Sequence, residues 1–142
     1  MNIQKGSCLC GRVTFEVVGD FDNFYLCHCS RCRKDTGSAH AANLFSSTAK
    51  LKWLSGADSV SNFTLENTQH SKSFCSACGS ALPNIQMDGK QLMVPAGSLD
   101  SDLSIQPTAH IFISNKANWD MNLEKYPMIE NLPAPASTES NP

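Results

Sequence analysis

The seven cysteines of this 142-residue chain constrain its fold more than any other feature. They fall into three tight clusters: Cys8 and Cys10; Cys27, Cys29 and Cys32; and Cys75 and Cys78. Their odd number and the C-x-C spacings argue against disulfides. The first residues show no signal-peptide-like apolar stretch, and no run is long enough to span a membrane. We therefore expect a cytoplasmic protein with reduced thiols that bind metal.

Two of the clusters have the spacing of a closed structural zinc site. Zinc prefers four ligands in a tetrahedron. The knuckle Cys75–Ser–Ala–Cys78–Gly79 turns the chain so that both sulfurs meet one ion. Cys8 and Cys10 lie two residues apart, so an extended chain points both sulfurs to the same side. Together the two pairs predict a four-cysteine zinc site that contributes directly to folding.

Cys27, Cys29 and Cys32 can all reach a second zinc from a single loop. Three protein ligands leave the fourth position open to water or substrate, which is the pattern of a catalytic zinc. Pairing the knuckle with two of these cysteines instead would leave more thiols unpaired. A histidine could also close the site, and the candidates are His28, His40, His70 and His110.

An open zinc with three thiolates favours sulfur chemistry. The site carries a net charge of about −1, so it acidifies bound water weakly and suits an incoming thiolate better. Thiol addition to a carbonyl, or the reverse cleavage, is the expected reaction. Neighbouring side chains could contact carboxylates (Arg31, Arg33, Lys34, Lys72) or metal-bound sulfur (Ser30, Thr36, Ser38), or could be ordinary surface and turn residues.

Short alternating runs predict an all-β domain of short antiparallel strands. The expected strands are 12–18, 23–27, 41–45, 59–66, 91–97 and 109–114, with a short helical turn through 30–37. Val13, Phe15 and Val17 should share the buried face of the first. We expect one domain over 1–130 and a mobile, Pro- and Ser-rich tail over 131–142.

The motifs "GSCLCGRVTFEV", "CHCSRCRKDTGSAHAA", "FCSACGSAL", "AGSLD" and "HIFISNKANW" resemble the glutathione-dependent formaldehyde-activating enzyme family, which includes centromere protein V. The resemblance covers about residues 5–133. It implies a β-tent fold, a structural zinc on Cys8, Cys10, Cys75 and Cys78, and a second zinc on the catalytic Cys27, Cys29 and Cys32. The implied activity is that of a carbon–sulfur lyase, which joins glutathione and formaldehyde as S-hydroxymethylglutathione.

This sequence departs from the family pattern at Lys72, where Arg is more usual, and in "EKYPMIENLP" after Trp119. Two other functions stay open: a binding module with two structural zincs, and a thiol or metal buffer without turnover. The net charge of −2 and the lack of a basic tail make nucleic acid an unlikely partner. The expected partner is a small thiol such as glutathione. The sequence predicts no particular oligomeric state.

Overall fold

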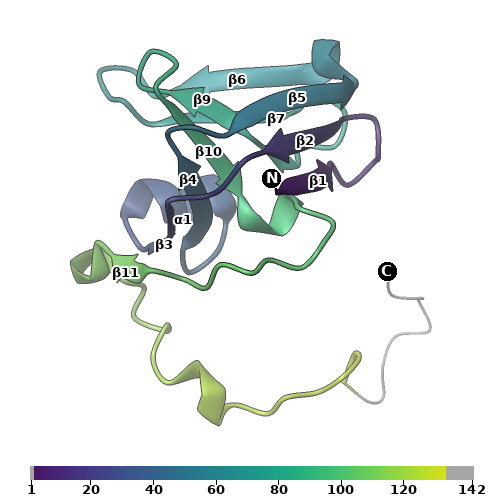
Figure 1. Cartoon of the computed structure of the whole chain (residues 1–142). Helices are drawn as coiled ribbons and strands as arrows, with labels where there is room; N and C mark the ends of the chain where they lie inside the picture. Colours follow the sequence, from purple (N-terminus) through teal and green to yellow (C-terminus); the bar gives the residue numbers. More distant parts are fainter. Residues whose placement is uncertain (1, 134–142) are drawn as a thin grey trace.

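A computed structural model describes residues 2–133 of the chain, which fold into short strands with a single α-helix in that range (Figure 1). The strands are β1 Ile3–Ser7, β2 Thr14–Val18, β3 Asn23–Cys27, β4 Ala41–Ser46, β5 Lys50–Ser55, β6 Val60–Thr64, β7 Ser71–Cys75, β8 Ala81–Leu82, β9 Asn84–Gln86, β10 Gln91–Pro95 and β11 Ala109–Ile111. The helix α1 is Ser30–Thr36, and the 3-10 turns are η1 Ala57–Ser59, η2 Ala96–Ser98, η3 Ile113–Asn115 and η4 Leu123–Lys125. The all-β expectation is confirmed.

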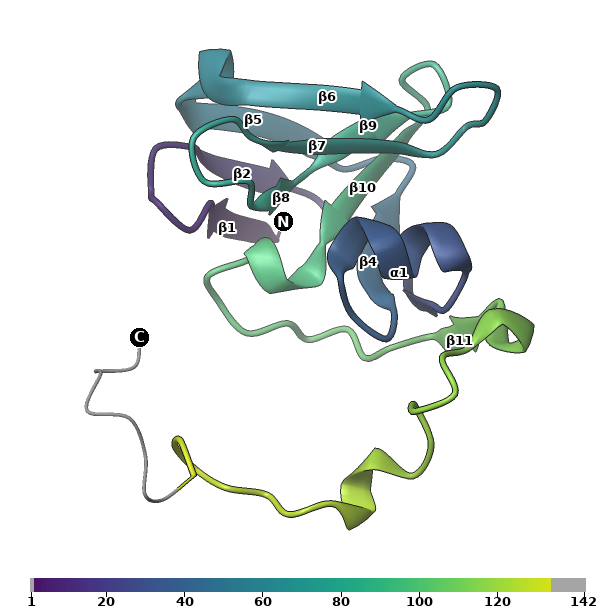
Figure 2. The same cartoon turned by 180° about the vertical axis from the view of Figure 1, so that it is seen from behind.

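The strands form three small sheets. Their orders are β1-β2-β5, β11-β3-β4-β10-β9 and β6-β7-β8. Neighbouring strands are antiparallel except β11, which pairs in parallel with β3. Seen from behind, α1 lies beside β4, with β6 and β7 across the far end of the domain (Figure 2). β3 ends at Cys27 and β7 ends at Cys75, so strands of two different sheets in this domain carry cysteines at their ends.

The core lies where these sheets meet. Val13, Phe15 and Val17 are fully buried, as the alternation in 12–18 predicted, and they pack with Leu44 and Leu82. β1 crosses this core closely, because Gly6 is paired with Phe15 and its missing side chain leaves room for the aromatic ring. A Cβ at Gly6 would collide with that ring and with the carbonyl oxygen of Ser98.

The predicted strands compare closely with the observed ones. The segment 23–27 matches β3, the runs at 12–18, 59–66 and 91–97 contain β2, β6 and β10, and β4 extends one residue beyond the run at 41–45. The predicted helical turn is α1. The strand expected over 109–114 is wrong beyond Ile111, because Phe112 takes a left-handed conformation with φ of 56° and η3 follows. Beyond the predicted set, the structure adds β1, β5, β7, β8 and β9.

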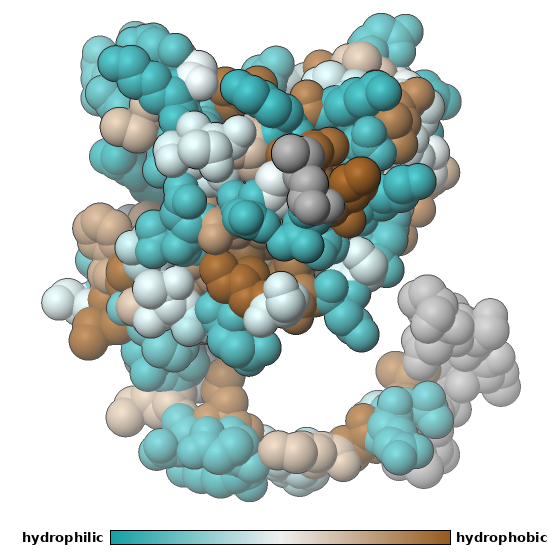
Figure 3. Space-filling view, in the orientation of Figure 1, coloured by the Kyte–Doolittle hydropathy of each residue, from teal (hydrophilic) through white to brown (hydrophobic). Residues whose placement is uncertain are grey.

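After η3 the chain still contacts the body, where Ala117 and Asp120 are buried, and it then leaves as an arm over residues 121–133 (Figure 3). Several apolar side chains after η3 are exposed, including Trp119 and Met128. Residues 131–133 are exposed, whereas 134–142 lie outside the described residues, so the predicted domain boundary at 130 and the mobile tail stay predictions. No helix within residues 2–133 is long and apolar enough to cross a membrane.

Candidate metal centres and the adjoining cavity

The first candidate centre gathers Cys8, Cys10, Cys75 and Cys78, whose sulfur atoms all lie within 4.8 Å of one another. The Sγ atoms of Cys8 and Cys10 are 3.6 Å apart, and those of Cys10 and Cys75 are 4.0 Å apart. Four sulfurs bound to zinc at about 2.3 Å lie about 3.8 Å from one another in a tetrahedron. The four thiols, all free of disulfides, could therefore hold one metal ion.

Two short turns position these four sulfurs. In the knuckle, the N–H of Gly79 donates to the Cys75 carbonyl at 2.7 Å, and Gly79 has a left-handed φ of 77° that favours glycine. In the first loop, the N–H of Val13 donates to the Cys8 sulfur at 3.3 Å. The N–H of Leu9 donates to the Ser80 hydroxyl at 2.9 Å and so ties the two turns together.

The first centre favours an anionic sulfur even before any metal is considered. Hydrogen bonding to the side chain and backbone of Ser80 lowers the pKa of Cys78 to about 5. The Cys8 pKa is also lowered: burial opposes the thiolate, but the Val13 N–H and the neighbouring Cys10 thiol outweigh it. Thiolates are the form that metals bind, so these hydrogen bonds suit the site to a soft cation.

The second candidate centre consists of Cys27, Cys29 and Cys32, again with all sulfurs within 4.8 Å of one another. Cys27 is the last residue of β3, and Cys29 is the N-cap of α1. The Cys29 sulfur accepts the N–H of Cys32 at 3.3 Å. The start of the helix therefore folds the three thiols into one cluster, without help from distant parts of the chain.

The pKa values of the three thiols in this second centre shift in different directions. Burial raises the pKa values of Cys27 and Cys32. Burial acts the same way on Cys29, but hydrogen bonds from the Cys32 N–H and the neighbouring thiols exceed it and lower the Cys29 pKa. Cys29 is therefore the sulfur that loses its proton first, and a bound cation would favour deprotonation of the other two.

Within residues 2–133, no fourth ligand group joins the second centre. His28 points away from it: Nε2 lies 2.8 Å from Nδ1 of His110, and Nδ1 lies 3.3 Å from Oδ2 of Asp120. The ring of His40 packs 5.0 Å from that of His28. Because His70 is bound to Asp35, no histidine is arranged as the closing ligand in the described part of the chain.

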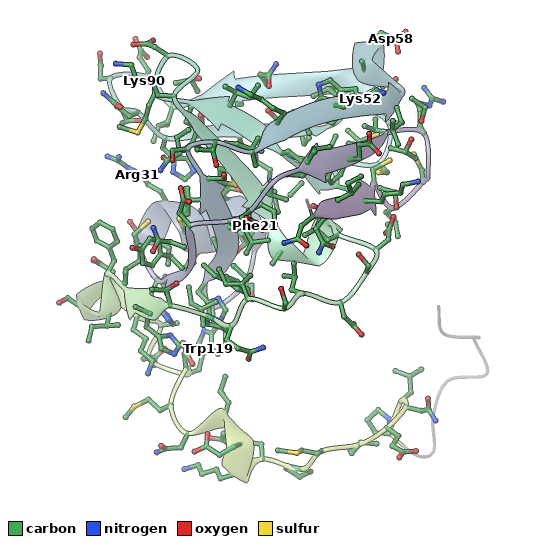
Figure 4. The ribbon with its side chains drawn as sticks, in the orientation of Figure 1. Phe21, Arg31, Lys52, Asp58, Lys90 and Trp119 are labelled. Atoms are coloured by element: carbon green, nitrogen blue, oxygen red, sulfur yellow. The ribbon has the colours of Figure 1, made fainter. Side chains whose placement is uncertain are left out.

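A cavity of about 330 Å³ adjoins the second centre, and Cys27 and Cys32 form part of its wall. Of the four basic residues considered from the sequence, Lys72 lines the cavity, whereas Arg31, Arg33 and Lys34 do not. Arg31 is exposed on α1 (Figure 4). The three-sulfur centre therefore has free space beside it, and of these four basic residues only Lys72 borders that space.

Of the two alternatives left open for the hydroxyl residues near the sulfurs, Thr36 fits the role of a turn residue. The Thr36 hydroxyl donates to the Cys32 carbonyl at 2.8 Å rather than to a sulfur, and Ser30 and Ser38 do not line the cavity. Ser80, which the sequence reasoning missed, lies 3.2 Å from the Cys78 sulfur. Its position two residues after Cys78 is the signal that could have identified it.

An all-β domain with one four-cysteine and one three-cysteine group defines a class of cysteine-rich, candidate metal-binding proteins. The family profile described as "Glutathione-dependent formaldehyde-activating enzyme" matches residues 3–115. A Halomonas elongata protein, provisionally named as an enzyme of that kind, is 35% identical over 124 residues, covering 82% of this chain and 79% of its own. The chain belongs to the glutathione-dependent formaldehyde-activating enzyme family.

A solved structure supports the fold. A Rhodobacter sphaeroides protein matches with a TM-score of 0.55 at 23% identity, covering 75% of this chain and 98% of that one. At this level of identity the likeness bears on the fold alone.

Proposed function

We propose that this protein binds two zinc ions and acts as a carbon–sulfur lyase on the adduct of a small thiol, such as glutathione, with formaldehyde. The observation that carries the proposal is a three-sulfur centre with no fourth ligand within residues 2–133, placed at the wall of a cavity. Family membership supports glutathione and formaldehyde as the small-molecule partners.

The two cysteine groups would hold the ions in different ways. Cys8, Cys10, Cys75 and Cys78 supply a full set of thiolate ligands, which fits a structural zinc. Cys27, Cys29 and Cys32 supply three, and zinc bound there would offer a coordination position that stabilises a thiolate at neutral pH. We assign the catalytic role to this second group.

The chain's own residues would orient the reaction. Cys27 and Cys32 face the cavity, so a substrate sulfur held near them has its substituents directed into that space. The Cys29 sulfur is held by the Cys32 N–H, which fixes the first turn of α1 beneath the site. The partly enclosed wall would limit water around the reacting atoms.

The test is the rate of exchange between free glutathione and S-hydroxymethylglutathione, followed by NMR exchange spectroscopy with an enzyme-free control, because the addition also proceeds without a catalyst. We expect an enzyme-dependent increase that Cys29→Ser removes together with one zinc. Cys10→Ser is the matched control: it should lose the other zinc and keep the rate, measured below its unfolding temperature. Exchange at the enzyme-free rate with two zincs bound would refute the proposal and favour a binding module or a metal buffer.

A further inference from the structure

The cavity beside Cys27 and Cys32 has a mainly apolar wall. Tyr25 of β3, Phe45 of β4, Met93 of β10 and Ile111 of β11 line it from one sheet, and Leu82 lines it from β8 of another. Leu82 and Met93 are buried, so their contribution is fixed by core packing. A wall of this kind binds a ligand chiefly by removing apolar surface from water.

The charged groups on this wall neutralise one another. Asp35 contacts both basic residues of the wall: one carboxylate oxygen is 2.8 Å from Lys72 Nζ, and the other is 2.8 Å from His70 Nε2. Lys72 Nζ also donates to the Asp35 carbonyl oxygen at 2.8 Å. Lys72 carries the only ammonium group that residues 2–133 place on the wall; it is already paired, and a ligand carboxylate would have to compete with Asp35 for it.

Of the four hydroxyl residues that the described part of the chain places on the wall, Thr36, Ser71 and Ser73 are also engaged, and Tyr25 is the fourth. Ser71 donates to Asn84, Ser73 donates to Asn62, and Thr36 donates to the Cys32 carbonyl. The remaining side-chain amides of the wall, Asn43, Gln69 and Gln86, carry no charge. Glutathione, in contrast, is a tripeptide with two carboxylates and an ammonium group, and inside the cavity these charges would find Asp35 and Lys72 already paired with each other.

We infer that the cavity takes an uncharged, apolar substituent of the substrate, attached next to the reacting sulfur. The inference rests on the proposed function and narrows its substrate class. The volume of about 330 Å³ far exceeds the space that formaldehyde needs. Two sources would supply such a group: an apolar thiol, or glutathione combined with a larger apolar aldehyde while its charged ends stay outside the cavity.

The chemistry is the same for both sources and needs no oxidant or reductant. The thiol sulfur forms a bond to the carbonyl carbon, the carbon–oxygen double bond becomes single, and the thiol proton is transferred to oxygen. Cleavage reverses each step. The apolar wall would act on either reactant only by binding the substituent that adjoins the new bond.

The first test measures binding of n-alkanethiols, from ethanethiol to hexanethiol, to the zinc-loaded protein by calorimetry. Affinity should rise by roughly fourfold for each added methylene until the cavity is filled. A flat series overturns the inference.

The second test changes the charge of the wall. In the wild type, propanethiol should bind more tightly than 3-mercaptopropionate, which has the same number of carbon atoms but carries a carboxylate in place of the terminal methyl group. Asp35→Asn releases Lys72 from its ion pair and should improve 3-mercaptopropionate relative to propanethiol by about tenfold or more. Asp58→Asn makes the same charge change at an exposed site away from the cavity (Figure 4) and should leave the ratio unchanged. An unchanged ratio in Asp35→Asn contradicts the inference.

Two exchange series then identify the source of the apolar group. One pairs alkanethiols with formaldehyde, and the other pairs glutathione with aldehydes from formaldehyde to hexanal. A rate that rises with chain length in either series supports the inference and names the reactant concerned. If both series are flat while glutathione and formaldehyde still turn over, the inference fails and the proposed function stands. If no thiol binds and no pair turns over, both fail.

Discussion

The four-cysteine group should stabilise the domain by joining distant parts of the chain, and Cys10→Ser tests this directly. The Cys10 side chain is exposed, so its replacement removes a candidate ligand with little loss of packing. An exposed substitution outside any special site usually changes the free energy of unfolding by less than about 0.5 kcal/mol. A much larger loss would therefore come from the metal.

The size of that loss follows from the loop that the metal closes. Cys10 and Cys75 are 65 positions apart. If the metal acts as a cross-link, constraining a loop of this length in the unfolded chain is worth about 4 kcal/mol. For a domain of this size, that corresponds to a fall in the unfolding midpoint of roughly 10–15 °C.

The matched control is Cys29→Ser, which removes a ligand from the other group. Serine is a good N-cap, so α1 keeps its cap. Cys27 and Cys32 are five positions apart, and the same relation makes their loop worth about 2 kcal/mol less than the long one. We therefore expect a clearly smaller shift for this variant.

The assay is thermal unfolding followed by circular dichroism, with the zinc content of each protein measured beforehand. Each variant should lose one of two zincs, and Cys10→Ser should unfold at the lower temperature. Loss of zinc from Cys10→Ser with a shift equal to or smaller than that of Cys29→Ser would refute the cross-link argument.

Three further predictions concern the core, acid and metal removal. Gly6→Ala should destabilise the fold by about 1–3 kcal/mol in urea unfolding, because its Cβ meets the Phe15 ring and the Ser98 carbonyl; an unchanged midpoint would contradict the packing described for β1. Burial lowers the His28 pKa below its usual 6.5, so protonation favours the unfolded chain and the free energy of unfolding should fall as pH drops below about 6.5. His28→Asn should make that fall shallower, and an equal slope would count against the assignment. A strong chelator should lower the wild-type midpoint more than that of Cys10→Ser, and equal shifts would mean that the first group holds no stabilising metal.

The sequence predicts elements well where one face is apolar and poorly where the chain is shaped by its neighbours. β2 is predicted because Val13, Phe15 and Val17 alternate on a buried face. β1, with the sequence IQKGS, offers no such pattern, since the residue it buries is Gly6. The alternation in 109–114 misleads beyond Ile111, because the conformation of Phe112 depends on tertiary context rather than on its own preference.

The candidate site shows the same division. Spacing alone predicts the two cysteine groups, because ligand geometry limits how thiols can share an ion. The Asp35, His70 and Lys72 cluster could not be predicted, since it joins α1 to a segment about 35 residues away through the packing of the whole domain. The His28 and Asp120 contact likewise depends on how the segment after η3 packs against the residue that follows β3.

The two cysteine groups span different lengths of sequence, and this difference fixes the order in which they can assemble on a growing chain. The second group needs only the stretch from Cys27 to Cys32, which leaves the ribosome early. The first group stays incomplete until Cys78 has emerged, when more than half of the chain has been made. If the two groups hold zinc as we propose, a nascent chain can load the three-cysteine centre before the four-cysteine centre, and the thiols of Cys8 and Cys10 stay unprotected in between.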